Sequence, residues 1–505
     1  MASSGERCLH VRPGGDQGLR RWGLRLLAAG IGALLTLAFP AAGAWWLGFV
    51  GLVPLVLVLR AAPSDREGLW LGLAAGAGFF AAIYHWLLPF VGVFALLFAV
   101  LLGLSWAPWG WLARRLLHGR LSAGRLAVAL AVLPSVWVLT EYARSWDRLA
   151  GPWGLLGTSQ WNVQPVLALA ALGGVWGLSF MLALVNVALA AALVPGTVRR
   201  LRTAALGVAV AAVAGTLVAG MLRPEPEITG TLRVAGVQPG VIEDADDRVA
   251  AQVDLTEELT GEQPALVVWG QLSVPVDPAS RPDVIAAIER AAGEVGAGVL
   301  VNVDERMDTE VFRTALLVEP DGPAARYQKT RLVPFGEYVP LRSLLEWVTG
   351  FTEAADVEIQ RGDQEVLLDV DGVLVGPLIS YESMFPDLRR RLAADGAQVT
   401  VVQGSTTSFQ GTWAQPQQAS VEAVRAVESG RSALLAQLSG VSSAFDPAGR
   451  ELRWVGADET GAYVVDLPLA GGITPFTRYG DWVPAAAAVI VAGALVTHVL
   501  VRWLA

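Results

Sequence analysis

The sequence is poor in lysine, cysteine and histidine, and each shortage excludes a kind of chemistry. Lys329 is the only lysine among 37 basic residues, and the others are arginine. The only cysteine, Cys8, excludes an intramolecular disulfide and a cysteine-based metal cluster. Residues 225–481 contain no histidine, which excludes a Ser-His-Asp triad and a histidine zinc site there. We therefore expect no metal and no cofactor. Without a P-loop or a suitable basic patch, we also expect no nucleic-acid partner.

Charge is scarce and unevenly divided. Charged residues make up 16% of the 505 residues, hydrophobic residues make up 53%, and the mean hydropathy is +0.48. Soluble globular proteins have about 25% charged residues, so the composition predicts an integral membrane protein with a soluble part. Residues 1–224 hold 17 arginines and 6 acidic residues, whereas residues 225–505 hold 20 basic and 40 acidic residues. The soluble part is therefore expected in the second half of the chain.

Long apolar runs set the domain plan. A helix needs about 20 apolar residues to cross a bilayer. Eight runs qualify: 22–39, 43–60, 68–88, 91–112, 124–141, 166–194, 203–221 and 482–501. The plan is a disordered tail (1–20), seven spans (21–223), a soluble domain (224–481) and an eighth span (482–505).

Arginine clusters predict the orientation. They flank the first span and recur in every second loop, for example at Arg114, Arg115, Arg120 and Arg125 and at Arg199, Arg200 and Arg202. Short cytoplasmic loops are rich in lysine and arginine. We therefore expect a multi-pass protein of the cell membrane with both termini cytoplasmic and the soluble domain extracytoplasmic.

The soluble region alternates apolar strands with helices. Strands are expected at 232–238, 265–269, 298–302, 314–319, 373–380, 399–403, 432–438 and 461–465, with helices near 244–261 and 281–296. Apolar strands interleaved with helices predict sheets covered on both faces, in a layered αββα arrangement. Sites in such folds gather at strand ends. Three segments qualify: Trp269-Gly-Gln271, the segment around Lys329, and Ile379-Ser-Tyr-Glu382.

Glu141 is the acidic residue that stands at the edge of a predicted span. Intramembrane carboxylates often mark functional sites. An alternative is that Glu141 snorkels or pins the polar loop that continues to Gln160.

The three segments, in this order, resemble the carbon-nitrogen hydrolase (nitrilase) superfamily. With eight spans around the soluble domain, the chain resembles the apolipoprotein N-acyltransferase family over nearly its whole length. The lysine motif Tyr327-Gln-Lys-Thr-Arg-Leu-Val-Pro-Phe-Gly-Glu-Tyr-Val-Pro340 carries most of this resemblance. Further matches are Gly151-Pro-Trp153 with Gln160, Gly174-Val-Trp-Gly-Leu-Ser179 with Asn186, Arg425-Ala426, Glu428, Gly430-Arg431, and Tyr479-Gly-Asp-Trp482.

The resemblance implies a reaction and a catalytic triad. The family transfers an acyl chain from a phospholipid to the N-terminal amine of a diacylated lipoprotein cysteine, through a thioester on an enzyme cysteine. It uses Glu as base, Lys at the oxyanion and Cys as nucleophile. At these positions the chain has Gln271, Lys329 and Ser380. Further departures are Ser405-Thr-Thr-Ser-Phe409, Gln418 at the family's histidine, and about Arg313 at its asparagine.

Two functions follow from these departures. An amide cannot accept a proton at neutral pH, and serine needs a base more than cysteine does, so the chain is expected to be an impaired or inactive homologue, a pseudoenzyme. It would bind phospholipid, lipoprotein or a membrane-enzyme partner. The alternative is an active acyltransferase that uses Ser380 as nucleophile and Glu337 as base. It is motivated by Lys329, Glu337 and Tyr381, which stand at matching family positions, and Glu382 is a further candidate base. Replacement of both residues by design, to trap a complex, is disfavoured by the additional changes at 405–408 and Gln418.

Overall fold

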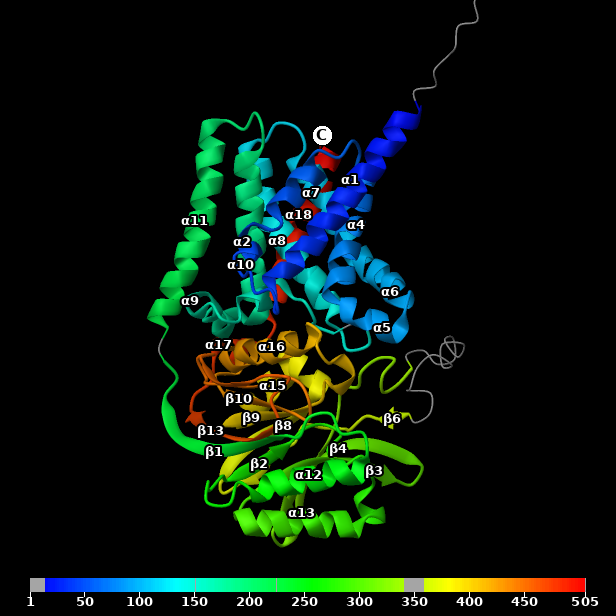
Figure 1. The fold of residues 1–505 in the computed structure, drawn as a ribbon. Helices are drawn as coiled ribbons and strands as arrows, with labels where there is room; N and C mark the ends of the chain where they lie inside the picture. The colour runs from blue at the N-terminus through cyan, green and yellow to red at the C-terminus, as the bar shows by residue number, and fades with distance from the viewer. Residues whose placement is uncertain (1–13, 150, 224, 340–357, 505) are drawn as a thin grey trace, which may run out of the picture.

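The computed structural model describes residues 14–149, 151–223, 225–339 and 358–504. Figure 1 shows a helical bundle stacked on an α/β domain. Cys8 and part of the predicted disordered tail lie outside the described residues. Within that predicted tail, α1 already begins at Gly14, so its last residues are helical.

The helical bundle contains the long apolar helices. Its elements are α1 (Gly14–Leu35), α2 (Leu47–Val50), α3 (Val53–Arg60), α4 (Asp65–Ile83), η2 (His85–Leu87), α5 (Leu88–Val91), α6 (Phe94–Gly103), α7 (Ala107–Leu117), α8 (Ala123–Arg144), η4 (Leu156–Gln160), α9 (Gln164–Leu167), α10 (Ala170–Leu193), α11 (Arg199–Leu222) and α18 (Trp482–Leu504). Among the described residues, six helices are long and apolar enough to cross a membrane, or up to seven if the pair Asp65–Ile83 and His85–Val91, bent by 60°, is one span.

The span expected at 43–60 is the shorter apolar stretch Leu47–Arg60, which is divided into α2 and α3. Pro54 lies in the first turn of α3, where its missing N–H is tolerated. The Leu52 amide donates to Oδ1 of Asn186 at 2.9 Å. A side chain from α10 therefore takes a hydrogen bond that a continuous helix would have kept.

The α/β domain contains two sheets. The first has the order β13-β1-β2-β3-β4-β5, with β6 paired to β4, and the second has the order β12-β11-β10-β9-β8-β7. The strands are β1 (Ile228–Gln238), β2 (Leu266–Trp269), β3 (Gly298–Met307), β4 (Glu310–Glu319), β5 (Gly322–Gln328), β6 (Ile359–Gln360), β7 (Leu368–Val370), β8 (Val373–Ile379), β9 (Val399–Gly404), β10 (Ser432–Gln437), β11 (Ser442–Phe445), β12 (Glu451–Val455) and β13 (Gly461–Ala470). The helices are α12 (Ala245–Glu257), α13 (Pro282–Val295), α15 (Pro386–Ala394), α16 (Ala414–Ser429) and α17 (Pro475–Tyr479).

Alternation along the strands builds the layers. In β1, Val234 packs between the two sheets, whereas its neighbour Ala235 packs against α12 and α13. In β9, Val401 faces the space between the sheets and Val402 faces the layer of α15 and α16. This alternation follows the two-residue period of a strand. The predicted αββα arrangement is confirmed.

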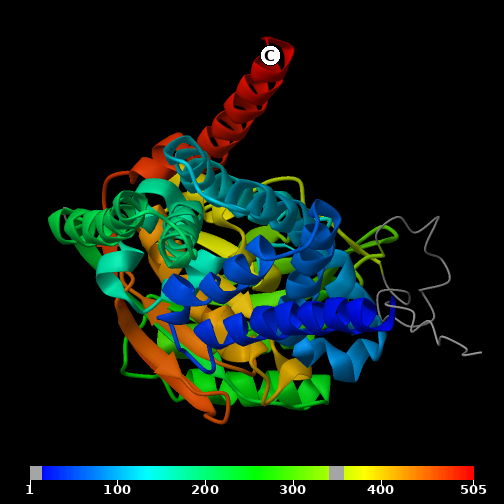
Figure 2. The same ribbon diagram turned by 90° about the horizontal axis from the view of Figure 1, so that it is seen from above.

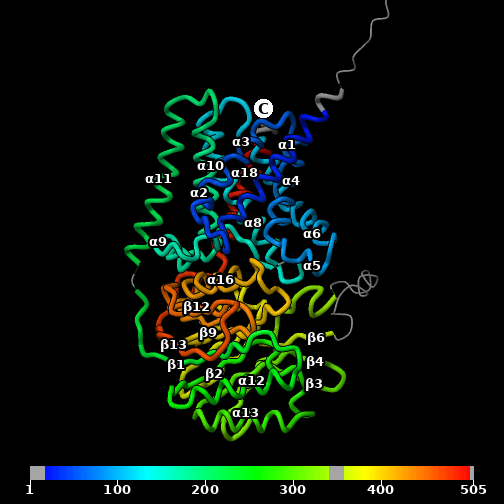
Figure 3. The backbone as a smooth tube through the Cα atoms, viewed as in Figure 1, coloured from blue at the N-terminus to red at the C-terminus, as the bar shows by residue number. Residues whose placement is uncertain are grey.

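The layer of α15 and α16 lies between the second sheet and the bundle (Figures 1 and 3). Buried residues of α16 share one hydrophobic core with the helical bundle. Helix α18 packs mainly on α8 and stands at the edge of the bundle in Figure 2. The start of α1 and the end of α18 lie at the same end of the bundle, away from the α/β domain.

Candidate active site

The ends of β2 and β8 are held together through β9. The backbone amide of Gln271, just after β2, donates to the carbonyl of Gly404 at the end of β9, at 2.9 Å. In the β8–β9 pair, Ile379 at the end of β8 lies opposite Gln403. A Cβ on Gly270 would lie 2.0 Å from the Leu438 nitrogen. The glycine before Gln271 therefore permits this close approach of the two sheets.

Lys329, Glu337 and Gln271 form a buried polar cluster. The Lys329 ammonium donates to both carboxylate oxygens of Glu337, at 2.7 and 2.8 Å. The side-chain amide of Gln271 donates to Oε1 of the same carboxylate at 3.3 Å, and the backbone amide of Val333 donates to Oε2 at 2.8 Å. Lys329 is 0% exposed, and Glu337 and Gln271 are each 7% exposed.

The charge state of Glu337 follows from these contacts. Burial alone would raise the pKa of Glu337, but the charge and hydrogen bonds of Lys329 hold it below its ordinary value. In all four hydrogen bonds the Glu337 carboxylate is the acceptor of an N–H group, as expected for an ionised carboxylate. The cluster is therefore a buried ion pair between Lys329 and Glu337, to which the neutral side-chain amide of Gln271 also donates.

Asp304 is a neighbour that the sequence did not single out. It lies opposite Arg313 in the β3–β4 ladder, and the two side chains form an ion pair of 2.6 Å. Burial raises the pKa of Asp304, Arg313 lowers it and Glu337 raises it. Arg313 also touches the lysine segment, because its carbonyl accepts from the Lys329 amide at 2.9 Å. A correct β3–β4 hairpin register would have revealed this pair.

Glu382 joins the lysine segment to the end of β8. It accepts hydrogen bonds from the Tyr327 hydroxyl (2.7 Å), from the amide and hydroxyl of Thr330 (2.7 and 2.9 Å), from the Arg331 amide (3.0 Å) and from the Ile379 amide (2.9 Å). Because Ser380 follows Ile379, these bonds also hold Ser380 beside the segment that carries Lys329. Glu382 is fully occupied by structural contacts.

Ser380 begins the short helix η8 (Ser380–Met384) with a positive φ of 50°. Its carbonyl accepts from Nε2 of Gln418 at 3.4 Å, and Gln418 accepts in turn from Gln437 at 3.2 Å. Within the described ranges of the chain, the Ser380 hydroxyl makes no hydrogen bond. Strained backbone of this kind clusters at active sites, but no base among the described residues is hydrogen-bonded to this hydroxyl.

Tyr381 points toward the helical bundle. A Cβ on Gly151, in the loop after α8, would lie 2.1 Å from the Tyr381 hydroxyl oxygen. The ring packs edge-on against Phe385, and burial raises the pKa of Tyr381 well above its ordinary value. The Gly151 position therefore has to be small for the loop to pack on this tyrosine.

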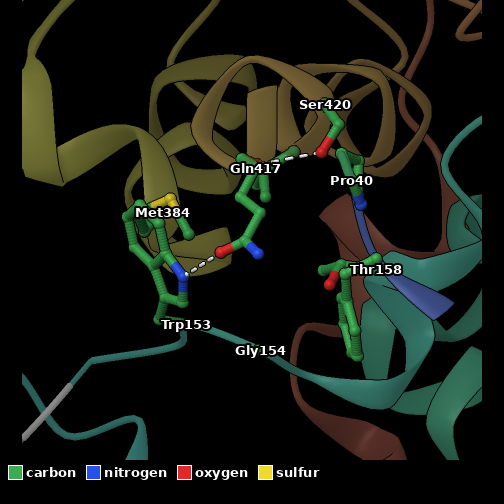
Figure 4. Close-up of a pocket in the computed structure, with 9 residues that line it drawn as sticks. Pro40, Trp153, Gly154, Thr158, Met384, Gln417 and Ser420 are labelled. Atoms are coloured by element: carbon green, nitrogen blue, oxygen red, sulfur yellow. Dashed lines mark hydrogen bonds between the residues drawn. The ribbon is translucent and has the colours of Figure 1, made fainter. Parts of the chain in front are cut away.

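The same loop is fixed to α16. The Trp153 indole donates to Oε1 of Gln417 at 2.8 Å. Figure 4 shows this contact beside a small cavity lined by Pro40, Thr158 and Met384 among others. The cavity offers about 10 Å³ to a water-sized sphere, which is room for about one water. It is lined by residues of both the bundle and the α/β domain and is too small for a lipid.

A second joint lies at a break in α10. Gly174 has φ 64° inside the helix, and the amide of the following Val175 donates to Glu428 at 2.6 Å. The other oxygen of Glu428 pairs with Arg425, and a Cβ on Gly174 would lie 2.5 Å from the ring of Phe476. A carboxylate of the α/β domain thus caps the second half of a bundle helix.

Glu141 has the contacts of a loop-pinning residue. It accepts from the Trp137 indole at 3.1 Å and from the Leu156 amide at 2.7 Å. Arg144, one turn later, donates to the carbonyls of Trp153 and Gly154 at 2.7 and 3.0 Å. These contacts match the alternative in which Glu141 pins the polar loop that continues to Gln160.

Among the described residues, no group of three or more His, Cys, Asp or Glu side chains could hold a metal ion.

Comparisons with known proteins match both parts of the chain. Residues 31–188 match the apolipoprotein N-acyltransferase N-terminal domain, and residues 233–473 match the carbon-nitrogen hydrolase domain. The apolipoprotein N-acyltransferase of Azotobacter vinelandii is 31% identical over 501 residues, covering 94% of this chain and 94% of the relative. The chain belongs to the apolipoprotein N-acyltransferase family. A second member, from Pseudomonas aeruginosa, is 31% identical and covers 91% of this chain and 93% of its own length.

Among solved structures, a cysteine-to-alanine mutant of an amidase of the nitrilase superfamily from Nesterenkonia AN1 is similar to part of this chain. It is 20% identical, covers 51% of this chain and 96% of its own, and has a TM-score of 0.38. Membership of the apolipoprotein N-acyltransferase family rests on the full-length relatives. The apolar helices and these relatives also mark the chain as a membrane protein.

Proposed function

We propose that this chain is an apolipoprotein N-acyltransferase homologue whose acyl-transfer centre is impaired, and that it retains binding of phospholipid and diacylated lipoprotein. One observation carries the proposal. The buried cation at the site, Lys329, is bound to both oxygens of Glu337, and the residue at the base position, Gln271, donates to the same carboxylate. Among the described residues, no proton acceptor is hydrogen-bonded to the Ser380 hydroxyl.

The chemistry of acyl transfer explains why this arrangement is unfavourable. The nucleophile must lose a proton, and the developing oxyanion needs a free donor. Gln271 is an amide, and the serine hydroxyl is a far weaker acid than a thiol. Loss of one member of a catalytic unit typically lowers the rate by about 10⁴–10⁶. Here two of three positions differ from the family pattern.

The alternative is an active enzyme in which Glu337 replaces the missing base. Its buried position beside Lys329 favours this alternative. Its lowered pKa and its four donors oppose it, because a good base at neutral pH has a pKa near 7. Glu382 is a weaker candidate, since its carboxylate holds the lysine segment to β8.

We also propose an orientation for this chain in the membrane. Alternate arginine-rich loops support cytoplasmic termini and an extracytoplasmic α/β domain in the cell membrane. The start of α1 and the end of α18 lie at one end of the bundle, which agrees with termini on one side. Fusions of a cytoplasm-dependent reporter to both termini test this orientation. Activity of the reporter at only one terminus would contradict it.

A second membrane enzyme is an alternative binding partner to the lipid and the lipoprotein.

Mass spectrometry of lipoprotein N-termini tests the impairment. The chain would be expressed in cells depleted of their own N-acyltransferase, together with Ser380→Ala and, as matched control from the same turn, Ser383→Ala. We expect no triacylated product from the natural chain, and product from the combined Gln271→Glu and Ser380→Cys variant. Product from the natural chain that disappears in Ser380→Ala and persists in Ser383→Ala would establish the alternative.

A further inference from the structure

A cluster of six arginines lies where the loop after α3 meets the loop after α7. We call it the α3–α7 cluster: Arg60, Arg66, Arg114, Arg115, Arg120 and Arg125. Helix α8 begins beside it and runs 22 residues to Arg144, next to the α/β domain. Such a helix spans about 33 Å, close to the thickness of a bilayer core. The cluster therefore lies at the opposite membrane interface from the candidate active site.

The arginines of the cluster bind mainly to neutral carbonyls. Arg125 donates to the carbonyls of Arg115, Leu116, His118 and Arg120 at 3.1, 2.9, 2.8 and 3.3 Å. Arg60 donates to the Gly119 carbonyl at 3.0 Å, and Arg114 donates to the Ala62 carbonyl at 2.5 Å. These bonds lock the two loops together, but they leave the positive charges uncompensated.

Few carboxylates balance the cluster. Asp65 lies 3.6 Å from Arg115, and the side chains are 46% and 39% exposed. The buried neighbour Glu67 is already bound by Arg25 at 2.8 and 2.9 Å. Within the described part of the chain, Arg66 and Arg120 are exposed and pair with no carboxylate. The cluster thus has a strong excess of positive charge.

Two further observations indicate the ligand. Nε of Arg60 is buried without a hydrogen-bond partner among the described residues, so a donor inside the cluster is left unused. Two tryptophans lie beside the cluster: the Arg115 guanidinium lies 5.4 Å from the ring of the partly buried Trp111, and Trp70 is 41% exposed. Tryptophan rings at this level are typical of the headgroup region.

We propose that the α3–α7 cluster binds the phosphate of an anionic phospholipid, through Arg66, Arg115 and Arg120. Guanidinium groups bind phosphate in a bidentate manner, and basic pockets between membrane helices suit anionic headgroups. The site is distinct from the acyl-transfer centre. It does not depend on the proposed function or on which side of the membrane the cluster faces.

Native mass spectrometry of the purified full-length chain in detergent tests the proposal. The probes are cardiolipin, phosphatidylglycerol and phosphatidylcholine. We expect the natural chain to retain the two anionic lipids at least about 10-fold more tightly than phosphatidylcholine, because each arginine near a headgroup contributes to binding. The combined Arg66→Gln and Arg120→Gln variant should lower the affinity for the anionic lipids about 10- to 30-fold.

The matched control is the combined Arg199→Gln and Arg200→Gln variant. It removes the same charge from exposed residues at the start of α11, and it should change the affinity less than about 2-fold. An equal loss in both variants, or no preference for anionic lipid, would overturn the site. Competition by millimolar inorganic phosphate would identify a soluble anion as the ligand and would also overturn it. Failure of either kind leaves the acyl-transfer proposal untouched.

Discussion

Replacing Lys329 by methionine should strongly destabilise the α/β domain, because it leaves Glu337 as an unpaired buried charge. The Lys329 side chain is 0% exposed and that of Glu337 is 8% exposed. Removing one partner of a buried pair costs about 3–5 kcal/mol. Glu337 keeps its bonds from Val333 and Gln271, so we expect the lower end, about 3 kcal/mol.

The assay is thermal unfolding of the full chain in detergent, followed by tryptophan fluorescence. For a domain of this size, about 3 kcal/mol corresponds to a fall in Tm of roughly 6–12 °C. Arg326→Met is the matched control, because Arg326 is 60% exposed in its pair with Glu305. An exposed pair contributes about 0–1 kcal/mol, so the control should move the Tm by no more than a few degrees.

A double variant separates charge pairing from packing. Lys329→Met combined with Glu337→Gln removes both charges and should recover most of the loss, because no buried charge is left without a partner. The reasoning is refuted if Lys329→Met costs less than about 1 kcal/mol, or if the double variant is as unstable as the single one.

Three further predictions concern pH and the joint between the domains. The lowered pKa of Glu337 means that its contribution to stability is complete above its ordinary value of 4.5 and is lost as the pH falls through the lowered value. The Tm difference from Glu337→Gln should therefore be constant above pH 4.5 and shrink as the pH falls from 4.5 through the lowered pKa. Glu428→Ala leaves the Val175 amide and a buried arginine unpaired, and should cost about 3 kcal/mol and speed hydrogen exchange at Val175, whereas unchanged exchange would contradict the contact. Gly174→Ala should cost about 1–3 kcal/mol in a Tm measurement because of its positive φ and crowded Cβ, and Gly177→Ala, with no atom nearer than 3.9 Å, should be neutral.

Local pattern predicted much of the fold. Long apolar runs located the bundle helices, and short apolar runs located most of the long strands, because both depend on residues close in sequence. The division of Leu47–Arg60 was not predictable, since it depends on Asn186, more than 130 residues away. Five strands were also missed. The strands β6, β7, β11 and β12 are short and carry little pattern, and β5 begins with a glycine and a proline and has few apolar residues.

The candidate site was located by its strand-end residues, but its bonding was not. Nothing in the sequence states that Lys329 binds Glu337 on both oxygens, or that Gln271 donates to the same carboxylate. The opposition of Asp304 and Arg313 depends on the register of a hairpin. Glu382, expected as a further base, holds backbone amides of the lysine segment. Such bonding arises from tertiary contacts, which no single-sequence pattern encodes.

The most direct measurement is a single-turnover reaction of the purified chain with a phospholipid that carries a fluorescent acyl chain. An impaired centre predicts no acyl ester on Ser380 in the natural chain. It predicts a thioester in the variant that combines Gln271→Glu with Ser380→Cys. A labelled Ser380 peptide from the natural chain, formed within the time of a normal turnover, would contradict the account.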